Sequence, residues 1–261
     1  MAERVALVTG AARGIGAAVA LRLAADGCAV VAVDRCADDP RLGYPLGTRD
    51  DLDRVVAACG EGAIACEADV RDASALDAAV ARAVLEFGGL DIAVAAAGVI
   101  AGGSMGWVTD DDVWEINLEV NLTGVWRTAK AALPAILDRA QPRAGRFVAI
   151  ASSAGLRSQR LISAYSAAKH GVIGLVQGLA LELGQTGVTA NSVCPGSTDT
   201  AILEASGALY GLASAAEFAV HHPMGRLLTP AEVASAVAWL CAEEQSGVTG
   251  ISLSVDGGMT I

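Results

Sequence analysis

Aromatic residues and positive charge are both scarce in this sequence of 261 residues. Phe, Trp and Tyr make up 4% of the chain, and 18 Lys and Arg stand against 29 Asp and Glu, which gives a formal net charge of −11. A chain this acidic lacks the basic surface to which nucleic acids and anionic lipids bind, so neither is expected as a partner. The core must be built from aliphatic side chains, for which a hydrophobic content of 53% is sufficient.

Signals for export, disulfide bonding and metal binding are also missing. The sequence runs from Met1 directly into the apolar segment 5–8, without the basic and apolar regions of a signal peptide. The six cysteines form no CxxC pair, and a chain of this length can bury a core without disulfides. His221 and His222 stand in no HExxH motif or Cys/His cluster, so no metal site is expected. We expect a cytoplasmic protein with reduced thiols.

Short apolar runs alternate with helical patterns along most of the chain. Candidate strands lie at 5–8, 29–33, 64–66, 92–96, 146–150, 189–193 and 251–255. Helical patterns lie near 15–26, 74–87, 111–138, 164–184 and 230–243, the last opening on a Thr229-x-x-Glu232 capping box. Nearly continuous apolar strands that alternate with helices indicate a parallel sheet buried on both faces. The sequence therefore predicts one α/β domain over 1–261, with a doubly wound parallel sheet of about seven strands.

Two segments interrupt this alternation. Residues 35–53 follow the second strand and are polar and rich in Pro and Gly, and residues 201–228 follow the sixth strand. Long loops in compact domains often cover binding sites. We expect 201–228 to cover a substrate, whereas 35–53 fits a surface loop and a lid equally well.

A glycine-rich turn follows the first strand and opens the first helix. It comprises Gly10, Arg13, Gly14, Ile15 and Gly16. Glycines at such a turn let a pyrophosphate approach the backbone and the positive end of the helix. The spacing is GxxxGxG and not the GxGxxG fingerprint, so a plain tight turn is the alternative interpretation.

Asp34 ends the second strand about 20 residues after this turn, where a carboxylate can hydrogen-bond the hydroxyls of an adenosine ribose. It would also repel a ribose 2′-phosphate, whereas Arg13 and Arg35 nearby could attract one. Because Asp34 lies where the ribose hydroxyls should reach, the sequence favours NAD over NADP.

Tyr165 and Lys169 are four residues apart in a helical pattern, so they share one face of the helix. A free tyrosine has a pKa of about 10, too high for proton exchange at neutral pH, and a neighbouring ammonium would lower that pKa. An ordinary surface pair is the alternative interpretation.

The motifs in combination resemble those of the short-chain dehydrogenase/reductase family. TGAARGIG (9–16), Asp69-Val70, NLTG (121–124), Ser152, YSAAK (165–169) and Pro195-Gly196 stand in that family's order over essentially the whole chain. The resemblance implies a single-domain Rossmann fold, a homotetramer, and hydride transfer between NAD(P) and a CH–OH group.

The same resemblance assigns roles to individual residues. Tyr165 would be the general acid/base, Ser152 would hydrogen-bond the substrate oxygen, and Lys169 would bind the nicotinamide ribose and lower the pKa of Tyr165. Asn121 would hold a water in a proton relay to Lys169. Further cofactor contacts would come from Asp69, Val70, Gly98, Pro195, Gly196, Thr198 and Thr200.

One departure from the family pattern lies after the fourth strand. The family has an Asn-Ala-Gly motif there, whereas this chain has Ala96-Ala97-Gly98. Because that asparagine ties strands together beside the cofactor, we expect a more mobile loop after Gly98 in an enzyme that is still active.

Segment 35–53 is similar to the carveol-dehydrogenase-like branch of the family, which is associated with the redox cofactor mycofactocin. The similarity rests on the pattern ADD…YPLGTRDDLD. The resemblance implies NAD held so tightly that an external carrier must reoxidise it. A loop folded over the adenosine would slow NAD release in this way.

These features predict an NAD-dependent enzyme that interconverts a secondary alcohol and a ketone, with a cyclic, carveol-like terpenoid as one candidate substrate. Two alternatives stay open. The same residues would serve a reductase of 3-oxoacyl thioesters on an acyl carrier protein, and a nucleotide-sensing protein could keep the fold without the chemistry.

Overall fold

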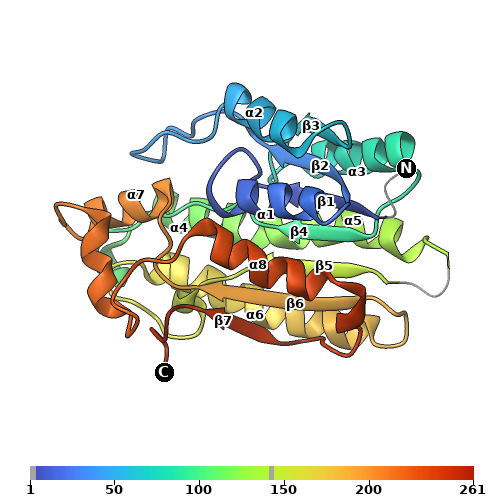
Figure 1. Ribbon diagram of the computed structural model, residues 1–261. Coiled ribbons are helices and arrows are strands. Elements are labelled where there is room, and N and C mark those ends of the chain that lie inside the picture. The colour runs from blue at the N-terminus through green and yellow to red at the C-terminus, as the bar shows by residue number, and fades with distance from the viewer. Residues whose placement is uncertain (1–3, 141–143) are drawn as a thin grey trace.

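Seven parallel strands form one sheet in the order β3-β2-β1-β4-β5-β6-β7 (Figure 1). The computed structural model describes residues 4–140 and 144–261, so residues 1–3 and 141–143 of the predicted domain lie outside the described residues. The strands are β1 (Val5–Thr9), β2 (Ala29–Asp34), β3 (Ala63–Glu67), β4 (Ile92–Ala95), β5 (Arg146–Ile150), β6 (Thr189–Pro195) and β7 (Ser252–Val255). The predicted doubly wound parallel sheet is confirmed, and the strand order reverses between β1 and β4.

Helices cover both faces of this sheet. One face carries α1 (Gly14–Ala25), α2 (Arg49–Cys59) and α8 (Pro230–Cys241), and the other carries α3 (Ala73–Phe87), α5 (Gly124–Leu137) and α6 (Ser163–Leu183). Side chains of β1 alternate between the two cores, with Leu7 on the α3–α5–α6 side and Val8 on the α1–α8 side. All five residues of β1 are therefore buried, which explains why such strands are continuous apolar runs. No helix within the described ranges is both long and apolar enough to cross a bilayer.

The two long loops predicted from the sequence both contain helices. The end of 35–53 is the start of α2, a mostly polar helix in which only Leu52 is buried. Its signal is a capping box formed by Thr48 and Asp51, of the same kind as the predicted box at Thr229, which is also present. Most of 201–228 is helical, with α7 (Ala201–Leu209) followed by a 3-10 segment (Ala215–His221).

The helix predicted over 111–138 is interrupted near its middle. α4 (Asp111–Leu118) runs into a π-helical turn (Glu119–Thr123) before α5 begins. At Gly124 a Cβ would lie 2.6 Å from Cγ2 of Val70, so glycine is required for this close approach. A π turn adds a residue to the helical repeat and often marks a functional site. Here it carries Asn121.

Candidate active site

A cleft opens at the carboxyl ends of the central strands, near the point where the strand order reverses. Its empty volume is about 1610 Å³, open solvent included, and open α/β sheets bind their ligands at this position. All of the predicted catalytic and cofactor residues line it: Gly10, Arg13, Gly14, Ile15, Gly16, Asp34, Arg35, Asp69, Val70, Gly98, Asn121, Ser152, Tyr165, Lys169, Pro195, Gly196, Thr198 and Thr200. The structure brings these residues together, whereas the role of each one stays a prediction.

The glycine-rich turn between β1 and α1 leaves backbone N–H groups free at the cleft. Gly10 and Gly14 have φ angles of 70° and 59°, which favour glycine, and a Cβ on Gly16 would overlap the carbonyl of Gly10. The N-terminus of α1 has no side-chain cap, whereas Thr48, Asp72 and Thr229 cap α2, α3 and α8. An uncapped helix N-terminus beside small residues fits an anionic group such as a pyrophosphate.

Asp34 lies at the end of β2 with its carboxylate facing the cleft. Its oxygens accept the N–H groups of Ala12 at 3.0 Å and Cys36 at 3.2 Å. A carboxylate offers about four acceptor positions, so capacity is left for ribose hydroxyls. The two arginines that could attract a 2′-phosphate are engaged elsewhere. Arg13 donates to the Pro45 carbonyl at 2.7 Å, and Arg35 pairs with two aspartates.

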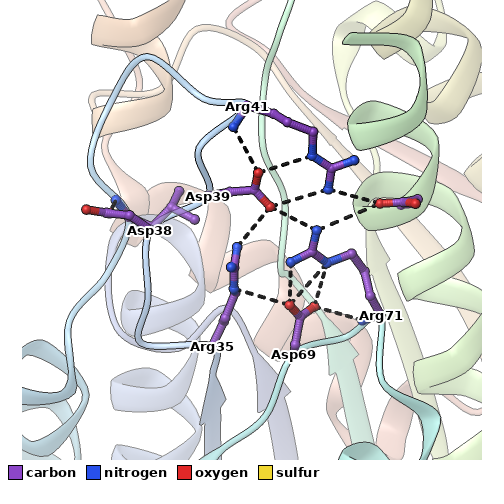
Figure 2. Close-up of polar contacts among 8 residues, drawn as sticks. Arg35, Asp38, Asp39, Arg41, Asp69 and Arg71 are labelled. Atoms are coloured by element: carbon purple, nitrogen blue, oxygen red, sulfur yellow. Dashed lines mark hydrogen bonds and ion pairs between the residues drawn. The ribbon is translucent and has the colours of Figure 1, made fainter. Parts of the chain in front are cut away.

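Figure 2 shows these two aspartates, Asp39 and Asp69, in a network of ion pairs that is centred on Asp39. Asp39 is 4% exposed and contacts Arg35, Arg41 and Arg71 at 3.1, 3.1 and 2.9 Å. Asp69 joins Arg35 and Arg71, and Glu119 completes the network beside Arg41. Burial alone would raise the pKa of the Asp39 carboxyl, but hydrogen bonds from Arg41 and Arg71 outweigh burial and hold that pKa well below its usual range.

The network fastens residues 35–48 across one end of the cleft, and we call this segment the adenosine loop because the sequence predicts that the adenosine binds beside Asp34 at this end. The loop reaches the cleft through Leu42, Leu46 and Gly47. At Gly47 a Cβ would lie 2.7 Å from the Cβ of Ala12 and 3.5 Å from Oδ1 of Asp34, so the loop passes directly over the glycine-rich turn. Of the two interpretations left open for this segment, the structure favours a wall of the cleft over a remote surface loop.

Tyr165 and Lys169 lie on the first turns of α6, with Ser152 just after β5. Lys169 is 3% exposed, and its Nζ donates to the Ile150 carbonyl at 2.8 Å and lies 5.7 Å from the centre of the Tyr165 ring. Ser152 hydrogen-bonds Tyr165, whereas the neighbouring Ser153 contacts the sulfur of Met259. The alternative of a surface Tyr–Lys pair is therefore wrong, because both groups lie inside the cleft.

Burial dominates the pKa values of this pair. It raises the pKa of Tyr165, an effect that the Ser152 hydroxyl offsets only in part, and it lowers the pKa of Lys169 to about 8. The pKa of Tyr165 thus moves in the opposite direction to the one expected from a neighbouring ammonium, because burial of the phenolate outweighs the effect of the Ser152 hydroxyl.

Asn121 holds the segment that follows β4. Its side chain accepts the Val99 N–H and donates to the Val99 carbonyl, both at 2.9 Å, and it also contacts the buried Asn117 at 3.4 Å. A Cβ on Gly98 would lie 3.2 Å from Oδ1 of Asn121 and 3.8 Å from Nζ of Lys169. Gly98 therefore lies directly against both predicted catalytic groups.

The opposite wall follows β6. Thr200 caps α7, and Thr198 donates to the Gly196 carbonyl at 3.1 Å. His222 is buried with Nε2 accepting the Ser197 N–H at 3.0 Å, so this histidine supports the segment 195–198. Across residues 4–140 and 144–261 no group of three His, Cys, Asp or Glu side chains could hold a metal ion.

The end of the cleft beyond Tyr165 is apolar and was not foreseen in detail from the sequence. No charged side chain lines this end in the described part of the chain. Gln159 and Ser206 are uncharged polar members of its lining, and most of the rest comes from the loop after β4, the start of α6, α7 and the 3-10 segment: Ile100, Ile162, Ile202, Leu203, Tyr210 and Phe218. Four of these residues lie in 201–228, whose mixture of small and apolar residues gave no clear pattern, and coverage of a substrate by this segment stays a prediction.

Comparisons with known proteins agree with this geometry. The family model described as enoyl-(acyl carrier protein) reductase matches residues 10–260. (−)-trans-Carveol dehydrogenase of Rhodococcus erythropolis is 40% identical over 99% of this chain and 98% of its own. The structure of carveol dehydrogenase from Mycobacterium avium in complex with NAD superposes with a TM-score of 0.93 at 35% identity, covering 99% and 98% of the two chains.

A short-chain dehydrogenase from Mycobacterium paratuberculosis bound to NAD gives a TM-score of 0.87 at 32% identity, covering 98% of this chain and 97% of its own. Both sequence and structure therefore match over nearly the full length of the chain. The protein belongs to the short-chain dehydrogenase/reductase family.

Proposed function

We propose that this protein is an NAD-dependent dehydrogenase that interconverts a secondary alcohol and a ketone. The observation that carries the proposal is the grouping of Ser152, Tyr165, Lys169 and Asn121 in one cleft, with Asn121 and Lys169 directly beside Gly98. NAD is favoured over NADP because Asp34 faces the cleft and both nearby arginines are held by other groups. Two structural relatives that bind NAD support the same choice.

In this proposal Tyr165 moves the proton while NAD, when bound, accepts the hydride. Tyr165 takes the proton from the alcohol O–H during oxidation and returns it to the developing alkoxide during reduction. Ser152 holds the substrate oxygen beside the phenol. A raised pKa keeps Tyr165 protonated, which suits the acid role in reduction.

Lys169 and Asn121 would bind the nicotinamide ribose and a relay water next to Tyr165. One of the three Lys169 donors is used by the Ile150 carbonyl, which leaves two for ribose hydroxyls or a water. The side-chain amide of Asn121 is engaged with Val99 on both its atoms. In the proposal these two bonds fix Asn121 in the π turn beside Gly98 and Lys169, where it would help to hold the relay water.

An uncharged cyclic alcohol fits the apolar end of the cleft, and carveol is the substrate we propose to test first. The carveol dehydrogenase relatives point the same way. A reductase of 3-oxoacyl thioesters would use the same four residues, and the relative turnover of a cyclic ketone and an acyl thioester separates the two.

The adenosine loop supports slow release of NAD, because its ion pairs must open before the adenosine can leave. An external redox carrier of the mycofactocin type would then reoxidise the bound cofactor. The experiment is to purify the protein without added cofactor and to follow nicotinamide absorbance after adding carveol. A rise of one equivalent per site, without reduction of added free NAD, is expected. Steady reduction of free NAD would overturn tight retention and leave an ordinary dehydrogenase.

A further inference from the structure

Tyr44 lies in the adenosine loop, and its side chain reaches the catalytic end of the cleft. Its Oη accepts the Ile100 N–H at 2.8 Å. Its ring belongs to the apolar cluster that contains Ile100, Ile162 and the ring of Tyr165. Burial raises the pKa of Tyr44 to about 12, so its hydroxyl stays protonated and neutral at any physiological pH.

Tyr44 binds Ile100, which is the last of three consecutive residues, 98–100, beside the predicted catalytic groups. Gly98 lies against Asn121 and Lys169, Val99 makes two hydrogen bonds with Asn121, and Ile100 lines the substrate end. Asn121 thus holds this segment from the π turn and Tyr44 holds it from the other side. Asn117 also donates to the Ala101 carbonyl at 3.0 Å, and Tyr44 supplies the contact to the Ile100 amide itself.

The position of Tyr44 is itself set by contacts within the adenosine loop. Oδ1 of Asp38 accepts the Leu46 N–H at 2.7 Å and so closes the part of the loop that contains Tyr44. Arg13 holds the Pro45 carbonyl at 2.7 Å, and the buried Asp39 joins three arginines. Tyr44 therefore reaches Ile100 only while the loop is fastened at the adenosine end.

We propose that Tyr44 is a positioning residue of the active site and that it makes closure of the adenosine loop a condition for hydride transfer. The proposal rests on the dehydrogenase function proposed above. Without the Tyr44 hydroxyl, the partly buried Ile100 N–H loses its acceptor and the segment 98–100 shifts. A displacement of reacting groups by about 1 Å can cost about 100-fold in rate.

The test compares Tyr44→Phe with Thr249→Val. Each substitution removes one hydroxyl that accepts a backbone N–H, but Thr249 serves Ala190, outside the cleft. For Tyr44→Phe we expect the single-turnover rate of alcohol oxidation to fall roughly 10- to 100-fold. NAD affinity and Tm should match those of Thr249→Val, whose turnover should equal that of the unaltered enzyme. A single-turnover rate within about twofold of the unaltered enzyme, or a loss of NAD affinity in place of rate, would overturn the proposal.

Hydrogen exchange supplies a readout that does not depend on activity. In the NAD-bound protein the Ile100 amide should exchange faster in Tyr44→Phe than in Thr249→Val, and Asp39→Asn should also speed it. Faster exchange together with an enzyme that oxidises no alcohol would mean that the proposed function has failed while Tyr44 still holds the segment. Unchanged exchange in Tyr44→Phe would mean that the positioning role has failed.

Discussion

Burial raises the pKa of Tyr165, the proposed general acid/base. If it is the general acid/base, Tyr165→Phe should bind NAD as tightly as the unaltered protein and lose about 100- to 10,000-fold in turnover. NAD binding by calorimetry and turnover with carveol would be measured on the same preparation. Unchanged turnover would remove Tyr165 from the mechanism, and binding without turnover in the unaltered protein would favour a nucleotide sensor.

The buried charge of Lys169 should lower the free energy of unfolding of the protein. The pKa of Lys169 falls from 10.5 to about 8 in the folded protein, so below pH 8 the buried charge destabilises folding by about 3 kcal/mol. Between pH 8 and 10.5 the unfolded chain binds more protons than the folded one, and stability rises with pH. Lys169→Met also loses the hydrogen bond to Ile150, so we expect a net gain of about 1–2 kcal/mol at pH 7.

Urea unfolding at pH 7 and pH 10 measures this effect. The difference between Lys169→Met and the unaltered protein should shrink at pH 10, because Lys169 of the folded protein has then lost its charge and most of the cost of burying that charge is gone. A variant less stable than the parent at pH 7 would contradict the assigned direction of the pKa change.

At the scale of elements, the adenosine loop depends on Asp39. The pKa of its carboxyl in the folded protein lies well below the ordinary 3.8. The ion pairs therefore persist at neutral pH and are lost only as the pH falls through this lowered pKa. Asp39→Asn should release NAD about tenfold faster, because it weakens three charge-assisted contacts. Stopped-flow displacement of NAD measures this rate. Asp53→Asn, which affects only an exposed pair on α2, is the control, and equal release rates in the two variants would argue against the loop as a clamp.

The segment after β4 allows a second test at this scale. Thr9 accepts the N–H groups of Ala96 and Ala97 at 3.1 and 3.2 Å, and Asn121 and Tyr44 hold the next residues. These contacts partly replace the missing family asparagine. The loop after Gly98 is still predicted to be more mobile than in relatives that have the asparagine. Ala96→Asn should therefore slow amide exchange over 98–100, and an unchanged rate of exchange would refute this prediction.

At the scale of the whole molecule, the homotetramer implied by the resemblance stays a prediction. Large apolar side chains are exposed on and beside α4 and α5, where Trp107, Trp114 and Trp126 are 83%, 45% and 44% exposed. Patches of this kind often mark subunit contacts. Light scattering should give a tetramer mass for the native protein and a smaller mass for Trp114→Glu, and an unchanged mass would move the interface elsewhere.

The sequence alone determined the order of the strands along the chain, the parallel sheet and the positions of the functional motifs. Buried parallel strands are continuous apolar runs, and chemistry-bearing residues such as Tyr165 and Lys169 are spaced by the helix repeat, so both signals are local. The missed helices α2 and α7 differ in composition from the others, because α2 is mostly polar and buries only Leu52, and α7 mixes small and apolar residues over a cleft.

Only the tertiary structure showed which residues the adenosine loop contacts. Its contacts join residues far apart in the chain, such as Asp39 with Arg71, Arg41 with Glu119 and Tyr44 with Ile100. The direction of the pKa change at Tyr165 likewise depends on burial, which the residue's own neighbours in sequence do not reveal. Local patterns specify elements and motifs, whereas desolvation and long-range pairing arise only when those elements pack together.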